Sequence, residues 1–309
     1  MRIALLAGGF GGARFAQALA ETAGPENLTV IGNVGDDVEV LGLHVSPDLD
    51  SVLYTLAGVF DSERGWGRRD ETWNVLETVA ELDGETWFKI GDRDTGLHLV
   101  RSKALRGGEP LSSITQRITA AFGVPTSLLP ATDDRLRTWL DTPAGEFPFQ
   151  EWFVARAYRD EVDGVRFEGA ETAGPAPGVI EALESADAIL IAPSNPYVSI
   201  APILAVQEIR FALERRRAPS IAVSPLIGGR TVKGPADRML ARLAGGTAPA
   251  QVTDCYLGLI DALVIDEVDA DGAGGVSDRG VRPIVTRTLM LDAEARRRLA
   301  EAALSVPVA

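Results

Sequence analysis

Apolar runs alternate with amphipathic stretches along most of this chain. The apolar runs predict strands at residues 2–7, 28–34, 187–192, 220–225, 261–267 and 283–290. The stretches between them predict helices at residues 12–21, 50–58, 70–82, 200–215, 234–244 and 292–304. Because strands and helices alternate, we expect an α/β fold with a Rossmann-like open parallel sheet and helices on both of its faces.

Two segments refine this expectation. The helix at 70–82 has Asp70 or Thr72 as a candidate N-cap, and Trp73 begins its apolar face. Residues 111–179 lack the strand–helix alternation and contain several prolines and aromatic-rich pieces such as FPFQEWFVARAY. We therefore expect a single domain with a core at about 1–110 and 180–309, into which a small α+β subdomain is inserted.

Composition and charge limit the partners of the protein. The chain has 309 residues, of which 46% are hydrophobic, and a formal net charge of −14. This acidity repels a nucleic-acid backbone, so we expect no nucleic-acid partner. No apolar run approaches the roughly 18 residues of a membrane span, and no signal-peptide pattern is present, so we expect no membrane partner. The single cysteine, Cys255, permits no internal disulfide, which favours a cytoplasmic location.

The stretch LLAGGFGGARF places a glycine cluster between the first strand and the first helix. Backbone amides of such a turn, at Gly9, Gly11 and Gly12, can approach phosphate oxygens at a helix N-terminus. The Walker pattern is absent, and in the dinucleotide pattern Arg14 would occupy the last glycine position. The second strand also ends without the acidic residue of a dinucleotide enzyme. An anion site is the favoured interpretation, and a tight packing turn without a ligand is the alternative.

Aspartates gather in the loop and helix start that follow the second strand: Asp36, Asp37, Asp48, Asp50 and Asp61. Carboxylates in such loops can hold Mg²⁺ or take a proton from an attacking hydroxyl. Each could instead only cap a helix, since Asp48 follows a proline and Asp50 precedes an apolar helix. Asn33, just before this cluster, suits a turn.

Charges of both signs follow in the stretch WFKIGDRDTGLHLVR, after a short predicted strand. Lys89, Arg93 and Asp94 are candidates for ligand contact, and His98 lies about one helical turn beyond Asp94. A solvated helix start is the alternative interpretation.

Two late loops follow predicted strands, and ligands bind at strand carboxyl ends in open α/β sheets. Ser194 and Asn195 could contact a base or ribose, while Gly228 and Lys233 could meet phosphate. The pattern G-x-S-x-G is absent, and only two histidines occur. A hydrolase triad and histidine-rich catalysis are therefore not supported. The candidate aspartates, glycines, asparagines and cations favour metal-assisted phosphoryl or nucleotidyl-type transfer.

Five stretches together resemble the CofD/FbiA family of coenzyme F-420 biosynthesis. They are AGGFGGARF, GNVGDDVEVLGLHVSPDLDSVLYTLAG, WFKIGDRD, APSNPYVSI and SPLIGGRTVKGPA. The resemblance implies a transferase that joins a phospho-acid, delivered as a guanosine diphospho-conjugate, to the terminal ribityl hydroxyl of the deazaflavin Fo and releases GMP. The acid would be phosphoenolpyruvate or 2-phospholactate, and the resemblance also implies a homodimer.

The resemblance also suggests roles for the candidate residues. It implies contacts to Fo from Asp50 and Lys89, and we expect Arg93 and Asp94 to belong to the same Fo site. Asp50 would hold Mg²⁺ or orient the attacking hydroxyl.

Asp36 would help to bind the metal, and Asp36 or Asp37 would assist catalysis. Gly9, Gly11 and Gly12 would cradle the diphosphate, with Asn33 nearby. The guanosine side would meet the four residues of the late loops, which are Ser194, Asn195, Gly228 and Lys233.

A second class of protein is the alternative interpretation of the glycine turn and the sheet. YvcK-like proteins have the glycine turn and the sheet but act as nucleotide-sugar-binding regulators. The stretches DLD…YTLAG and WFKIGDRD argue against that alternative here.

Overall fold

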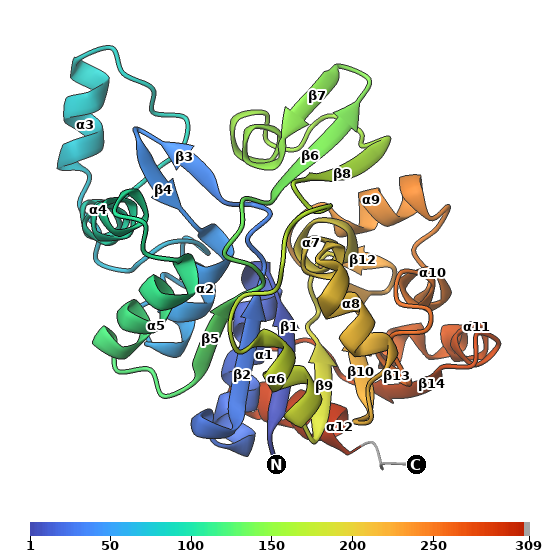
Figure 1. The fold of residues 1–309 in the computed structure, drawn as a ribbon. Coiled ribbons are helices and arrows are strands. Elements are labelled where there is room, and N and C mark those ends of the chain that lie inside the picture. The colour runs from blue at the N-terminus through green and yellow to red at the C-terminus, as the bar shows by residue number, and fades with distance from the viewer. Residues whose placement is uncertain (306–309) are drawn as a thin grey trace.

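The computed structural model describes residues 1–305 and is built on a seven-stranded parallel sheet (Figure 1). The strand order is β14–β13–β10–β9–β1–β2–β5. The strands are β1 (Ile3–Ala7), β2 (Leu28–Gly32), β5 (Ser127–Pro130), β9 (Ala188–Ile191), β10 (Ser220–Val223), β13 (Ala262–Asp266) and β14 (Arg282–Thr286). The chain adds β2 and β5 on one side of β1 and the later strands on the other. The order therefore reverses between β1 and β9, and the predicted Rossmann-like fold is confirmed.

Helices cover both faces of this sheet. On one face, α1 (Gly9–Ala23) packs between α2 (Pro47–Leu56) and α12 (Ala293–Leu304). On the other, α6 (Val179–Ser185) and α8 (Gln207–Glu214) pack together in front of the strands (Figure 1). The remaining α-helices are α3 (Asn74–Glu81), α4 (Asp92–Arg106), α5 (Leu111–Ala121), α7 (Ala201–Ala205), α9 (Ala236–Leu243), α10 (Pro249–Asp254) and α11 (Ala273–Ser277). The core lies between these layers, where all residues of β1, β9, β10 and β13 are buried.

The small subdomain begins later than expected. Helix α5 and strand β5 fall inside the range 111–179, yet β5 pairs in parallel with β2 at the edge of the main sheet. The separate part is a three-stranded antiparallel sheet of β6 (Arg137–Thr142), β7 (Gly145–Pro148) and β8 (Gly164–Glu168). Two hairpins complete the strands: β3 (Val38–Val40) with β4 (Leu43–Val45), and β11 (Leu226–Ile227) with β12 (Arg230–Thr231).

Two predicted helices differ in the structure. The single helix expected at 200–215 is instead a π-helical turn at Pro196–Ile200 followed by α7 and α8. Val206 between them is extended and fully buried, so core packing interrupts the helical path.

The helix expected at 70–82 begins only at Asn74 and buries none of its residues. Asp70, a candidate cap, adopts a left-handed conformation with φ 58° before the helix starts. The strand expected before α4 does not form, and residues 89–91 are coil.

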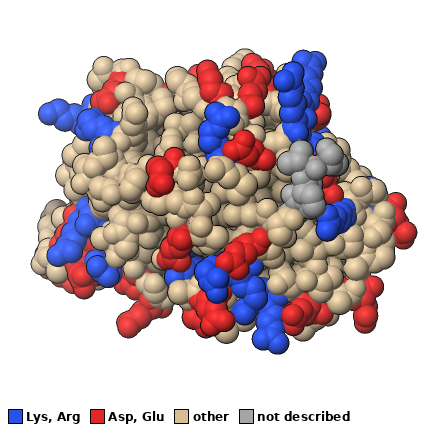
Figure 2. All heavy atoms as spheres, turned by 90° about the horizontal axis from the view of Figure 1, so that it is seen from below, with Lys and Arg blue, Asp and Glu red and all other residues tan. Residues whose placement is uncertain are grey.

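No helix within residues 1–305 is long and apolar enough to cross a membrane. Figure 2 views the molecule from below, toward the end of the sheet where the N-terminus lies. Acidic and basic side chains are interspersed over this face.

Candidate active site

The glycine turn lies where the strand order reverses, beside the loop that follows β9. Helix α1 starts at Gly9, so the amides of the turn belong to its first turn and point toward its N-terminal end. A Cβ atom on Gly11 would collide with the carbonyl oxygen of Pro193, and one on Gly12 would lie 2.9 Å from Ser194 Oγ. The glycines therefore permit close packing of two loops, and they also leave a helix N-terminus suited to an anion.

Ser194 and Asn195 lie beside this turn and already have partners in the protein. Ser194 Oγ donates a hydrogen bond to the Gly8 carbonyl oxygen (2.7 Å). Asn195 Oδ1 accepts from the Tyr197 amide (3.0 Å), and its Nδ2 lies 3.2 Å from Met239 Sδ. These bonds position the loop after β9 beside the glycine turn that follows β1, where the strand order reverses. Contact of the two side chains with guanosine stays a prediction.

Asp48 links the glycine turn to the end of β2. Asn33 Nδ2 donates to Asp48 Oδ2 (2.9 Å), and the Gly9 amide also donates to this carboxylate. Burial raises the pKa of Asp48 to about 6, and the bonds from Asn33 and Gly9 limit that rise. The sequence placed Asp48 in the aspartate cluster but gave it no role. The structure places it in the first turn of α2, between Asn33 at the end of β2 and the glycine turn.

Asp36 and Asp37 lie next to Asp48 and are also buried. Burial, together with the charge of Asp48, raises the pKa of Asp36 well above its ordinary value. Asp37 Oδ2 accepts from Ser46 Oγ (2.9 Å) and contacts His44 Nε2 (2.9 Å). The Oδ1 atoms of Asp36 and Asp37 are buried and have no hydrogen-bond partner in the structure. Such oxygens suit a cation or a hydroxyl of a ligand.

Asp50, two residues beyond Asp48 on α2, has a different environment. Arg101 on α4 binds both of its carboxylate oxygens, with Nη1 at 2.9 Å from Oδ2. Arg101 is itself only 1% exposed, and His98 Nδ1 lies 3.9 Å from Asp50 Oδ2. A direct metal contact of Asp50, as expected from the family, would require this ion pair to open. That role stays a prediction.

Candidate residues around the start of α4 separate into exposed and buried groups. Lys89 and Arg93 are exposed, whereas Asp94 and His98 are buried. Burial raises the pKa of Asp94 to about 7 and lowers the pKa of His98 to about 4. His98 is therefore neutral near pH 7. The structure does not bring Lys89 or Arg93 into the buried carboxylate cluster.

The two candidate residues after β10, Gly228 and Lys233, also lie in different surroundings. Gly228 turns the β11–β12 hairpin with φ 60°, and its amide donates to Asp269 Oδ2 (2.9 Å). Lys233 instead reaches the glycine turn: its Nζ donates to the Gly65 carbonyl oxygen (2.7 Å) and lies 5.1 Å from the centre of the Phe10 ring. Lys233 is thus placed to meet an anion at the start of α1.

One pocket adjoins the small sheet, and another adjoins the segment between β7 and β8. The first, of about 550 Å³, has Asp36 and Asp37 in its lining and is bounded by β6 on its other side. Within residues 1–305, no three His, Cys, Asp or Glu side chains form a metal-binding group. Magnesium bound by one or two carboxylates and ligand phosphates does not need three.

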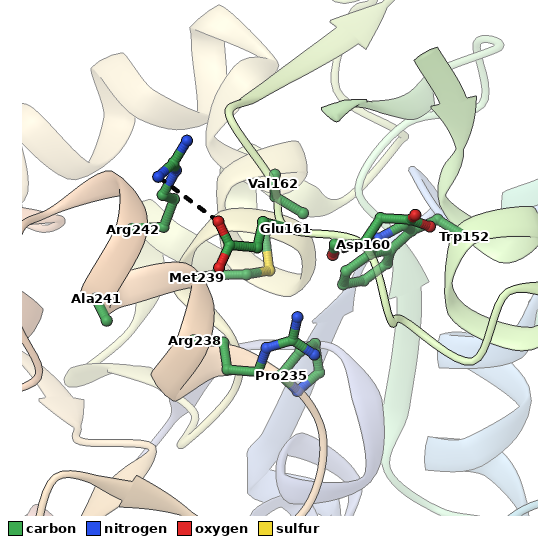
Figure 3. A pocket seen from close by; sticks show the side chains of 9 residues that line it. All are labelled: Trp152, Asp160, Glu161, Val162, Pro235, Arg238, Met239, Ala241 and Arg242. Atoms are coloured by element: carbon green, nitrogen blue, oxygen red, sulfur yellow. Dashed lines mark hydrogen bonds and ion pairs between the residues drawn. The ribbon is translucent and has the colours of Figure 1, made fainter. Parts of the chain in front are cut away.

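The second pocket, of about 300 Å³, lies between α9 and the segment before β8 (Figure 3). Arg242 on α9 pairs with Glu161 (3.6 Å) and Asp163 (2.6 Å), and Arg238 donates to the Tyr158 carbonyl oxygen (2.7 Å). None of the residues expected at the site line it. These contacts fasten the subdomain to α9.

The fold and these residues define the class: a Rossmann-like α/β protein with a glycine-rich helix start and a buried carboxylate cluster at its topological switch point. The chain belongs to the CofD family, whose model, described as "2-phospho-L-lactate transferase CofD", matches residues 3–293.

Curated relatives and solved structures agree with this assignment. The chain is 43% identical to a phosphoenolpyruvate transferase of Streptomyces griseus, covering 99% of this chain and 98% of that one. It is 38% identical to a phosphoenolpyruvate transferase of Mycobacterium bovis, covering 93% and 94%. A solved structure of a UPF0052 family protein from Bacillus halodurans shares the fold with a TM-score of 0.66, at 17% identity, and covers 98% of each chain.

Proposed function

We propose that this protein transfers phosphoenolpyruvate from its guanosine diphospho-conjugate to the terminal ribityl hydroxyl of the deazaflavin Fo, with release of GMP, in coenzyme F-420 biosynthesis. The observation that carries this proposal is 43% identity over 99% of the chain to a phosphoenolpyruvate transferase. The family description, which names 2-phospho-L-lactate, makes that acid the second candidate.

In the proposed reaction, the Fo hydroxyl oxygen attacks the phosphorus that bears the acid. The bond from this phosphorus to the bridging oxygen breaks, and that oxygen leaves with GMP. The hydroxyl proton passes to a carboxylate of the cluster, for which Asp36 and Asp37 each offer an unpartnered buried oxygen. The first-turn amides of α1 and Lys233 would bind the diphosphate.

Magnesium is the cofactor we propose, and Asp36 with Asp48 fit it best. Burial raises the pKa of both carboxyl groups, and the charge of Asp48 adds to the rise for Asp36, as that of Asp37 does for Asp48. Asp36 also retains an unpartnered oxygen. A bound Mg²⁺ would offset the repulsion among the buried carboxylates and neutralise charge on the diphosphate. Asp50, neutralised by Arg101, would shape the Fo side of the site together with Asp94 and Lys89.

The test combines purified protein, Fo, Mg²⁺ and each guanosine conjugate, with products identified by mass spectrometry. We expect product from the phosphoenolpyruvate conjugate and none after chelation of Mg²⁺. Absence of product from either conjugate, combined with thermal stabilisation by UDP-N-acetylglucosamine but not by Fo, would favour the nucleotide-sugar-binding alternative.

Replacement of Asp36 tests the carboxylate cluster. We expect Asp36→Asn to lower kcat by about 10²- to 10³-fold, because it removes an electrostatic and metal-binding group. Asp278→Asn, at an exposed carboxylate far along the chain, is the control and should retain wild-type turnover. Full activity of Asp36→Asn would remove Asp36 from the mechanism.

A further inference from the structure

The pocket of about 550 Å³ has opposite charges on different parts of its wall. Asp36 and Asp37 line it at the end of β2, while Arg106 of α4, Arg137 of β6 and Arg135 just before β6 line it elsewhere. Acidic and basic residues therefore line different parts of the same pocket, and the acidic side chains at the end of β2 are themselves buried.

The three arginines differ in what they bind within the protein. Arg135 forms an ion pair with Glu168. Within residues 1–305, Arg106 and Arg137 form no ion pair. Arg137 Nη1 donates to the Leu136 carbonyl oxygen (2.7 Å), and Arg106 Nη1 contacts the Gly42 carbonyl oxygen (3.3 Å). Since a guanidinium carries five N–H donors, both retain donors for a ligand.

Within residues 1–305, the other carboxylates of the pocket form their hydrogen bonds with groups other than Arg106 and Arg137. Asp133 accepts hydrogen bonds from the amide (2.6 Å) and hydroxyl (2.7 Å) of Ser112. Asp134 accepts from the Gly174 amide (2.9 Å). Glu39 contacts His44 Nδ1 (2.9 Å). Arg137, which is half-buried, thus lines the pocket with a guanidinium that has no ion-pair partner among the described residues.

We infer that Arg137, assisted by Arg106, binds the carboxylate of the acid that is transferred. The inference rests on the proposed function, because it takes the donor to be a phospho-acid conjugate. In phosphoenolpyruvate and in 2-phospholactate alike, the carboxylate is attached to the carbon that bears the phosphate ester oxygen. When the phosphorus lies at Asp36, the carboxylate therefore lies in the same pocket, and a planar guanidinium matches its geometry.

This arrangement has a consequence for specificity. Arg137 selects donors that carry a carboxylate at this carbon, because a neutral group would leave the guanidinium desolvated and unpaired. It does not distinguish phosphoenolpyruvate from 2-phospholactate, since both place the carboxylate alike.

The test measures donor binding by calorimetry, without Fo and with Mg²⁺. The two donors are the guanosine conjugate of phosphoenolpyruvate and its carboxyl methyl ester. We expect the wild type to bind the acid about 10- to 100-fold more tightly than the ester, as for a charge-assisted hydrogen bond. Arg137→Gln should bind both within about twofold of each other, and Arg137→Lys should restore part of the preference.

Arg135→Gln is the matched control, because Arg135 lines the same pocket but is paired with Glu168. It should keep the wild-type preference. Equal binding of the two donors by the wild type, or an undiminished preference in a folded Arg137→Gln variant, would overturn the inference. Because binding is measured without transfer, a failure of the proposed reaction would appear separately, in the product assay.

Discussion

Arg101 determines the chemistry available to Asp50. Both residues are buried, and the carboxylate is bound on both oxygens by the guanidinium. Removal of one member of such a pair leaves an uncompensated buried charge, whereas removal of both does not. The pair joins α2 to α4, so its loss affects the fold and the position of Asp50.

We predict that Arg101→Met lowers the free energy of unfolding by about 3–5 kcal/mol. The double variant Arg101→Met with Asp50→Asn should recover part of this loss. Arg297→Met breaks an exposed pair with Glu301 and should change stability by less than about 1 kcal/mol. Urea denaturation measures all four proteins, and a double variant no more stable than Arg101→Met would contradict the prediction.

Asp94 gives a prediction for the pH dependence of stability. Burial raises its pKa to about 7, from the ordinary aspartate value of 3.8. Between these values the folded protein retains a proton that the unfolded chain has released, so this residue lowers the free energy of unfolding as pH rises. Asp94→Asn cannot titrate. Its stability relative to the wild type should therefore increase from pH about 4 to about 7 and then stay constant.

Urea denaturation over this pH window measures the difference directly. Asp83→Asn, at an exposed aspartate, should follow the wild-type curve. Parallel curves for Asp94→Asn and the wild type would show that Asp94 has the same pKa in the folded and unfolded protein.

At the scale of elements, α3 depends on a residue outside its own segment. Asp92, the first residue of α4, accepts hydrogen bonds from Thr72 Oγ1 (2.6 Å) and from the amides of Asn74 (3.1 Å) and Val75 (3.0 Å). These bonds lower the pKa of Asp92 to about 2. Since α3 buries none of its residues, this cap is its main attachment.

We predict that Asp92→Ala speeds amide hydrogen exchange in Asn74–Glu81 while exchange in the strands of the main sheet stays as in the wild type. The reason is that the freed amides of the first turn lose their acceptor. Glu77→Ala, on the exposed surface of the same helix, is the control. Unchanged exchange in α3 of the Asp92→Ala variant would contradict the proposed cap.

The success of sequence-based prediction also differs between elements. The strands were predicted because a strand buried on both faces is apolar throughout, as in β9. The π-helical turn and the break at Val206 were not, because residues 200–215 keep a helical pattern while core packing interrupts the backbone. Strand β5 was missed because SLLP is short and ends in proline.

At the scale of the whole molecule, acidic residues outnumber basic ones, so the few cations near the site matter for binding an anionic ligand. The chain has 44 acidic and 30 basic residues, and the face in Figure 2 mixes both signs. The cations placed near the site, Lys233 and Arg137, come from segments far apart in the chain. The homodimer and the cytoplasmic location stay predictions.

The sequence by itself determined the strand–helix order, the glycine turn, the grouping of aspartates and the family, because these depend on residues that are close along the chain. Only the tertiary structure decided which aspartate contacts the glycine turn and which is neutralised. Asp48 and Asp50 are neighbours on one helix, yet one faces Asn33 and the other Arg101. Their chemistry depends on partners that are distant along the chain and are brought together by the sheet and its helices. A local sequence pattern cannot predict such partners.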